Sequence, residues 1–206
     1  MPIVPHVRTG AIDWTGENPG MLLKTDPDGD WSVLVLFFRV VWSPVGPGNM
    51  LLLFENPLSE TGLPETCNVI MCDNEALRDY IKTGFIEKLG TFGGAPAYNT
   101  ASQLTIDDVV THGDPTSDFY SETITGGGQE IKLVWENLGE PTALELPPEL
   151  TGTGKHTMYS LLVDAKTAYV EVNGRRLEGE TVPREQAGLA LSSAFLYFSE
   201  TWIFPD

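Results

Sequence analysis

The run from Trp31 to Trp42, WSVLVLFFRVVW, restricts the possible fold more than any other stretch of the sequence. It has one charge in twelve residues, it is rich in β-branched and aromatic side chains, and turn-forming DPDGD and SPVGPG segments bound it. These features favour a buried strand over a helix. At about 3.3 Å per residue the run would span roughly 40 Å, twice the length of an ordinary strand. We therefore predict a long strand that coils through two parts of a sheet or around a barrel.

Both faces of this predicted strand are apolar. One face carries Leu34, Leu36, Phe38, Val40 and Trp42, and the other carries Val33, Val35, Phe37, Arg39 and Val41. A strand that is apolar on both faces is expected to be covered on both sides. The sequence thus predicts a core strand in which Arg39 is the single charged residue.

Most of the remaining chain also has strand character. We expect strands over 49–55, 66–71, 103–111, 118–125, 130–138, 143–146, 155–164, 167–172, 175–179 and 194–204, with a hairpin turn at Asn173-Gly174. One amphipathic helix is expected at about 74–89, capped by Asp73, and a long loop is expected from Gly90 to Ser102. This pattern predicts a mainly-β, single-domain protein over residues 1–206, built as an antiparallel β-barrel or a two-layer sandwich.

The charge balance narrows the possible partners. Twelve Lys and Arg residues against twenty-nine Asp and Glu residues give a net charge of −17, so this is an acidic protein. Binding to nucleic acid or to an anionic membrane surface needs clustered basic side chains, and we expect neither partner. The sequence shows no secretory signal and no membrane-spanning run, and Cys67 and Cys72 do not suggest a disulfide framework. These features favour a cytoplasmic protein.

Familiar catalytic and metal-binding motifs are missing from the sequence. The Asp26-Pro27-Asp28-Gly29-Asp30 turn starts like a calcium loop but lacks the glycine and glutamate that an EF-hand requires. There is no G-x-S-x-G elbow, H-E-x-x-H motif, P-loop or dinucleotide fingerprint. We therefore expect no cofactor and no metal site.

Arg39 allows two interpretations, because a buried guanidinium must be paired or must meet an anion. It can form an internal ion pair, with Glu55 or Glu200 as the candidate carboxylates. Alternatively, it can line a pocket and bind the carboxylate of a ligand through its two-pronged guanidinium.

Further candidate site residues are titratable or aromatic. His156 opens a strand after the glycine-containing stretch Thr151–Gly154, and Glu200 lies between Phe198 and Trp202 on one face of the last strand. As acid and base, His156 and Glu200 are the candidate catalytic pair. The candidate ligand-binding residues are Arg39, Tyr98, Trp135, Tyr159 and Trp202, although the same aromatic residues would also suit an ordinary core.

Three functions follow from this reading. The first is a protein that binds a small organic molecule, with a carboxylate as a candidate feature of the ligand, in an aromatic-lined pocket. The second is an enzyme, a cofactor-independent isomerase, lyase or decarboxylase that uses His156 and Glu200. The third is a structural subunit of a homo-oligomer that binds no ligand.

Overall fold

The computed structural model describes residues 10–186 and 188–204, and within them the chain is mainly β. Thirteen of the described strands form one large sheet, and two more form a separate hairpin. The strands are β1 (Ala11–Glu17), β2 (Gly20–Leu23), β3 (Val33–Trp42), β4 (Gly48–Phe54), β5 (Asn68–Cys72), β6 (Ser102–Thr105), β7 (Asp108–Gly113), β8 (Phe119–Gly126), β9 (Gln129–Leu138), β10 (Thr142–Leu146), β11 (His156–Val172), β12 (Arg175–Arg176), β13 (Pro183–Gln186), β14 (Leu189–Ser192) and β15 (Ala194–Ile203). The helices are α1 (Glu75–Gly84), η1 (Ile86–Lys88), α2 (Gly90–Gly93) and α3 (Pro96–Thr100).

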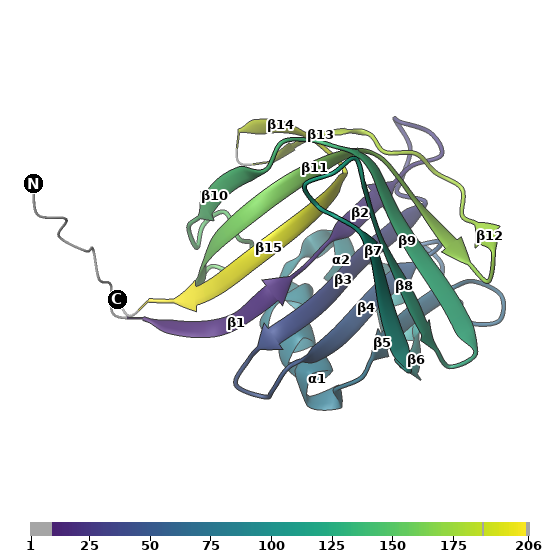
Figure 1. Cartoon of the computed structure of the whole chain (residues 1–206). Helices are drawn as coiled ribbons and strands as arrows, with labels where there is room; N and C mark the ends of the chain where they lie inside the picture. The colour runs from purple at the N-terminus through teal and green to yellow at the C-terminus, as the bar shows by residue number, and fades with distance from the viewer. Residues whose placement is uncertain (1–9, 187, 205–206) are drawn as a thin grey trace, which may run out of the picture.

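The large sheet folds back on itself without closing into a barrel. Its main path runs β6-β5-β4-β3-β1-β15-β11-β9-β8-β7, and all pairs along it are antiparallel except β5 with β6. The two ends of the path, β6 and β7, are consecutive in the chain. Between them, the backbone N–H of Ile106 donates to Cys72 and that of Asp107 donates to Thr125. The part formed by β7, β8 and β9 therefore lies over the part formed by β3, β4 and β5 (Figure 1), as in a sandwich.

The predicted core strand is β3, and its two faces lie in two different cores. Leu34, Leu36, Phe38 and Val40 pack with the helical segment in one apolar cluster. Val33, Val35 and Phe37 pack with β8, β9 and β11 in the other. The result is three layers, with the helices behind β3 and β4 and the folded-back strands in front (Figure 1).

The main helix is shorter than the sequence suggested and is capped by a different residue. Asn74 is the N-cap and accepts a hydrogen bond from the backbone N–H of Leu77 at 3.1 Å. Asp73, the expected cap, instead accepts two hydrogen bonds at 2.7 Å from the backbone and side-chain nitrogens of Asn49. Leu77 and Ile81 form the buried stripe of α1.

Other expected elements also differ from the structure. The strand expected over 103–111 is divided into β6 and β7, and that expected over 175–179 is reduced to β12. The expected loop from Gly90 to Ser102 contains the short helices α2 and α3, and α3 starts at Pro96, a residue suited to the first turn of a helix. The expected turn between Asp164 and Thr167 is absent, and β11 continues through it as one strand of 17 residues. Ala165 at this point pairs with Ala194 of β15 on one side and Leu138 of β9 on the other, so both neighbours hold the strand extended.

Candidate functional site

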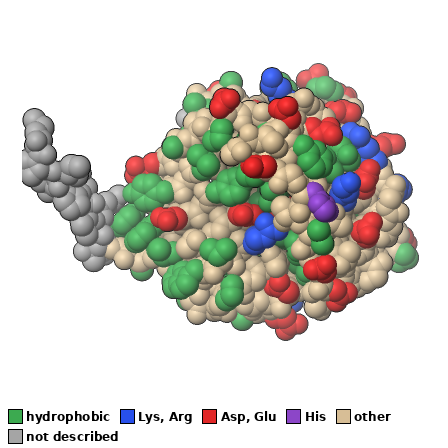
Figure 2. All heavy atoms as spheres, viewed as in Figure 1, with side chains coloured by type: hydrophobic (Ala, Val, Ile, Leu, Met, Phe, Trp, Pro, Cys, Tyr) green, Lys and Arg blue, Asp and Glu red, His purple; other side chains and the backbone are tan. Residues whose placement is uncertain are grey.

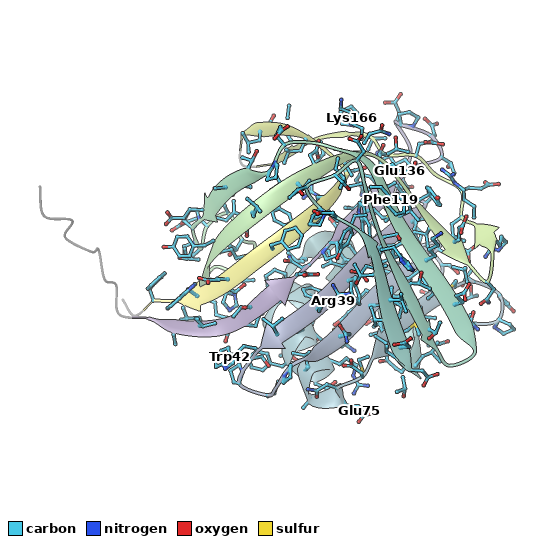
Figure 3. The ribbon with its side chains drawn as sticks, in the orientation of Figure 1. Arg39, Trp42, Glu75, Phe119, Glu136 and Lys166 are labelled. Atoms are coloured by element: carbon cyan, nitrogen blue, oxygen red, sulfur yellow. The ribbon has the colours of Figure 1, made fainter. Side chains whose placement is uncertain are left out.

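Arg39 of β3 faces the folded-back strands, and its side chain lies between β1 and β7 (Figure 3). Its Nη2 atom donates to Oε2 of Glu122 and to Oγ1 of Thr111, both at 2.8 Å, and its Nη1 atom is ion-paired with Glu17. Glu122 is fully buried and also accepts hydrogen bonds from Thr111 at 2.9 Å and from the Tyr120 hydroxyl at 2.6 Å.

Arg39 forms an internal ion pair, which was the first of the two interpretations of this residue. Its partners differ from the two carboxylates that the sequence suggested. The partners are Glu17 and Glu122, whereas Glu55 pairs with Arg175 and Glu200 is exposed. Partial burial opposes the charged form of Arg39, but the hydrogen bond and charge of Glu122 outweigh it and raise the pKa of the guanidinium above its ordinary value. Both terminal nitrogens of Arg39 are already occupied by groups of this chain.

His156 belongs to a second buried network, which ties α1 to two strands of the sheet. Its Nε2 atom lies 2.7 Å from Oδ2 of Asp13, and its Nδ1 atom lies 2.9 Å from Oγ1 of Thr153. The Tyr80 hydroxyl of α1 donates to the other carboxylate oxygen of Asp13. Burial alone would raise the pKa of Asp13, but the hydrogen bonds from His156 and Tyr80 together lower it below its ordinary value.

The proposed acid and base do not meet. In the pairing of β11 with β15, His156 lies opposite Ile203 and Glu200 lies opposite Tyr159, three positions away. Because the side chains of a strand alternate between faces, His156 and Glu200 point to opposite sides of the sheet. His156 is 1% exposed, whereas Glu200 is exposed and accepts a hydrogen bond from Nε1 of Trp202 at 3.1 Å. The two residues therefore cannot act on one substrate in this structure.

The predicted aromatic residues are also dispersed. Trp135 is fully buried in the core between the two parts of the sheet, where its Nε1 donates to the carbonyl of Gly20 at 3.1 Å. Tyr98 is buried on α3 in the other core, and its burial, the largest effect, raises the pKa of its hydroxyl to about 12. Tyr159 and Trp202 share the outer sheet face with Glu200, and Trp202 stacks on Phe204.

That outer face is partly apolar. Trp42 is 48% exposed and Leu161 is 41% exposed. The space-filling view in Figure 2 shows apolar side chains there with acidic side chains scattered among them.

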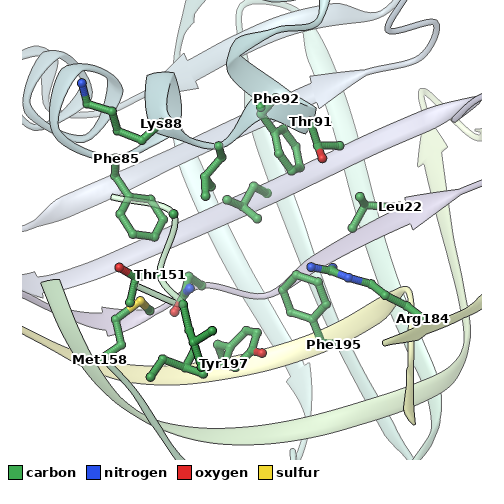
Figure 4. A pocket seen from close by; sticks show the side chains of 17 residues that line it. Leu22, Phe85, Lys88, Thr91, Phe92, Thr151, Met158, Arg184, Phe195 and Tyr197 are labelled. Carbon is green, nitrogen blue, oxygen red and sulfur yellow. The ribbon is translucent and has the colours of Figure 1, made fainter. Parts of the chain in front are cut away.

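A cavity of about 340 Å³ lies elsewhere, between the helical segment and the sheet (Figure 4). Phe85 and Phe92 face it from the helical side, and Met158, Phe195 and Tyr197 face it from β11 and β15. The full lining is Asn18, Leu22, Leu36, Phe85, Lys88, Leu89, Gly90, Thr91, Phe92, Leu146, Leu150, Thr151, Gly152, Met158, Arg184, Phe195 and Tyr197. None of the seven candidate residues from the sequence is among them.

Arg184 of β13 is the cation placed in this cavity. Its guanidinium carbon lies 5.8 Å from the centre of the Phe195 ring, and in Figure 4 the side chain extends across that ring into the cavity. Partial burial lowers the pKa of Arg184, and no carboxylate of the described residues lies within ion-pair distance of it. Lys88 lines the cavity too, but its amine points away from the other labelled side chains (Figure 4).

Neither Arg184 nor Asn18 stands out in the sequence as a candidate site residue. Arg184 lies between the expected strands at 175–179 and 194–204, in a segment to which no element was assigned. Asn18 lies in a Glu-Asn-Pro-Gly sequence that is typical of a turn. The cavity draws on several separate segments of the chain, and only the folded structure brings them together.

Comparisons with known proteins give no family for this chain. No protein-family model, curated protein or solved structure shows a significant match to it. Within the described ranges, no group of three or more His, Cys, Asp or Glu residues could hold a metal ion, and no helix has the length and apolar character to cross a membrane. The function has to be argued from the residues of the cavity.

Proposed function

We propose that the protein binds a small, mostly apolar organic molecule that carries a carboxylate or a similar oxyanion, in the cavity between the helical segment and the sheet. A volume of about 340 Å³ falls in the range of small-molecule sites, at its lower end. Leucine, methionine and phenylalanine side chains make up most of the lining. A largely apolar pocket with a few placed polar groups is the usual composition of such sites.

The observation that carries this proposal is the position of Arg184. A guanidinium stays charged in proteins, and a charge that loses water without gaining a counter-ion destabilises the folded state. Arg184 is partly buried beside Phe195 and has no carboxylate partner among the described residues. Arg39, in contrast, is paired with Glu17 and Glu122. An oxyanion on the ligand would supply the counter-ion that Arg184 lacks, through the bidentate geometry that guanidinium groups favour.

Isothermal titration with straight-chain carboxylic acids and the matching primary alcohols tests the proposal. Each pair shares its apolar chain, so the difference in affinity reports the contact with Arg184. A charge-assisted hydrogen bond contributes about 1.5–3 kcal/mol, so we expect an acid to bind at least about tenfold more tightly than its alcohol. Native mass spectrometry of freshly purified protein would show a retained ligand directly.

Three variants locate the site. Arg184→Gln should remove the preference for acids over alcohols and leave alcohol binding intact. Arg176→Gln, at an exposed position of β12, is the matched control and should leave the preference unchanged. Thr91→Trp, at an exposed position that lines the cavity, should weaken the binding of both classes by blocking the space. Equal affinity for acids and alcohols in the unmodified protein would contradict the proposal.

A further inference from the structure

Another polar residue, Asn18, lines the same cavity. Asn18 lies between β1 and β2, and its backbone N–H donates to the carbonyl of Tyr197 at 2.8 Å. The next carbonyl along the chain, that of Pro19, accepts a hydrogen bond from Phe37 at 2.9 Å. The backbone around Asn18 is therefore held to β15 on one side and to β3 on the other, and its side chain lines the cavity.

The side-chain carbonyl oxygen of Asn18 is buried and has no hydrogen-bond partner among the described residues. Asn18 is 5% exposed, and its Oδ1 atom contacts no donor in the part of the chain that the structure describes. Buried Asn68 differs, since its side chain donates to the Thr61 carbonyl at 2.7 Å and to Thr66 Oγ1 at 3.1 Å. Buried side-chain amides are normally satisfied in this way. An unpaired amide that lines a ligand cavity indicates that the ligand supplies the missing partner.

We infer that the ligand is a hydroxylated organic acid, whose oxyanion binds Arg184 and whose hydroxyl binds Asn18; this inference rests on the proposed function. The amide has a carbonyl acceptor and an NH₂ donor, and either end can be turned toward the cavity. A hydroxyl both donates and accepts, so it can bind the amide in both orientations. A second carboxylate has no proton to offer the carbonyl oxygen of Asn18 and fits less well.

Arg184 and Asn18 approach the cavity beside two neighbouring residues of one face of β15. Arg184 lies over Phe195, and Asn18 is hydrogen-bonded to the backbone of Tyr197. Phe195 and Tyr197 are two residues apart on one face of the strand, with ring centres 5.0 Å apart. Two residues of a strand span about 7 Å.

A scan of hydroxyl positions tests the inference. Isothermal titration would compare one straight-chain acid with its hydroxy isomers, in which the hydroxyl occupies successive carbons. We expect one isomer to bind about tenfold more tightly than the parent acid, because only one hydroxyl position can reach Asn18 while the carboxylate binds Arg184. If the parent acid binds more tightly than its alcohol but no hydroxy isomer improves on it, the inference is wrong and the proposed function stands. If neither acid nor alcohol binds, both are wrong.

Variants at Asn18 test whether the hydroxyl of the ligand binds this residue. Asn18→Leu keeps a similar side-chain shape and should abolish the gain from the hydroxyl while the parent acid binds at least as tightly as before. Asn18→Ala is a second variant. It leaves more space in the cavity and should likewise abolish the tighter binding of the hydroxy acid. Asn99→Leu, at an exposed position of α3 outside the cavity, is the control and should leave the gain unchanged. A gain that persists in both Asn18 variants would overturn the assignment to Asn18.

Discussion

The guanidinium of Arg39 and the carboxylate of Glu122 lie 2.8 Å apart, although 83 residues separate them in the chain. The contact joins β3 to β8 across the two parts of the folded sheet, and Glu122 is completely shielded from water. Thr111 and Tyr120 complete the set of hydrogen bonds around it. Since every partner lies within the chain, this network serves the packing of the two sheet layers against each other.

Replacing Arg39 by methionine should destabilise the protein by about 3 kcal/mol or more, because Glu122 would keep a buried charge without its counter-ion. The double variant Arg39→Met/Glu122→Met removes both charges and should be more stable than Arg39→Met alone. Urea unfolding of the three proteins measures these differences. A near-normal free energy of unfolding for Arg39→Met would show that the pair does not stabilise the fold.

The Asp13 network should contribute a pH-dependent part of the stability. The pKa of Asp13 is lowered in the folded protein, so its stabilising effect is present above the pKa of the unfolded chain. It is lost as the pH falls through the lower folded value. We therefore expect Asp13→Asn to be less stable than the unmodified protein at pH 7, with the difference shrinking below about pH 3.8, the ordinary value for an aspartate. Urea unfolding at several pH values measures this difference.

The variant Tyr80→Phe distinguishes the contributions of the two groups, Tyr80 and His156, that donate hydrogen bonds to Asp13. It removes the hydrogen bond from α1 and leaves the contact with His156 in place. The pH-dependent difference from the unmodified protein should therefore be smaller than that of Asp13→Asn. A stability difference for Asp13→Asn that stays constant from pH 7 to pH 3 would contradict this account.

The sequence predicted the parts of the fold that depend on local patterns. The alternation within Trp31–Trp42 predicted that both faces of β3 are buried, and the structure confirms this from Val33 to Phe38. It was wrong at the end of the strand, where Val41 is 62% exposed and Trp42 is 48% exposed. In the strand predicted over 130–138, Ile131, Leu133 and Trp135 occupy every second position and so share a face, and all three lie in one core. These predictions succeeded because the period of a strand fixes which side chains share a face.

The site could not be predicted in the same way. The partners of Arg39 and the contact of Arg184 with Phe195 depend on which strands become neighbours, and no local spacing encodes that pairing. The prediction of a turn near Ala165 was wrong for a related reason. Pairing with two neighbouring strands keeps β11 extended through a segment of weak strand character. His156 and Glu200 were each plausible alone, but their register puts them on opposite faces.

Cys67 should be unreactive in the folded protein. It is 3% exposed, and burial, together with the nearby charge of Glu55, raises the pKa of its thiol to about 12. Burial also raises the pKa of Cys72, which is 4% exposed. Because the thiolate is the reactive form, a thiol-specific disulfide reagent at pH 8 should modify neither cysteine in the native state and both in urea. Rapid modification of Cys67 without denaturant would show that this part of the core opens.

A side chain should be poorly tolerated at Gly16. A Cβ atom at this position would lie 2.0 Å from the carbonyl oxygen of Arg39, and the backbone φ of +155° is itself unfavourable for other residues. The oxygen belongs to β3, the neighbouring strand of β1, and cannot move without disturbing the Arg39 network. Gly16→Ala should therefore destabilise the protein by at least about 2 kcal/mol, measured by urea unfolding.

Gly84 provides the matched control for this substitution. It lies in the last turn of α1, and a Cβ atom there would meet nothing within 4 Å. Alanine is the better helix former, so Gly84→Ala should leave the free energy of unfolding unchanged or raise it by up to about 1 kcal/mol. If Gly16→Ala and Gly84→Ala had the same effect, the close approach of β1 to β3 at Arg39 would not be a constraint on the fold. A large loss for Gly16→Ala alone would show that the two strands hold their backbones in this register.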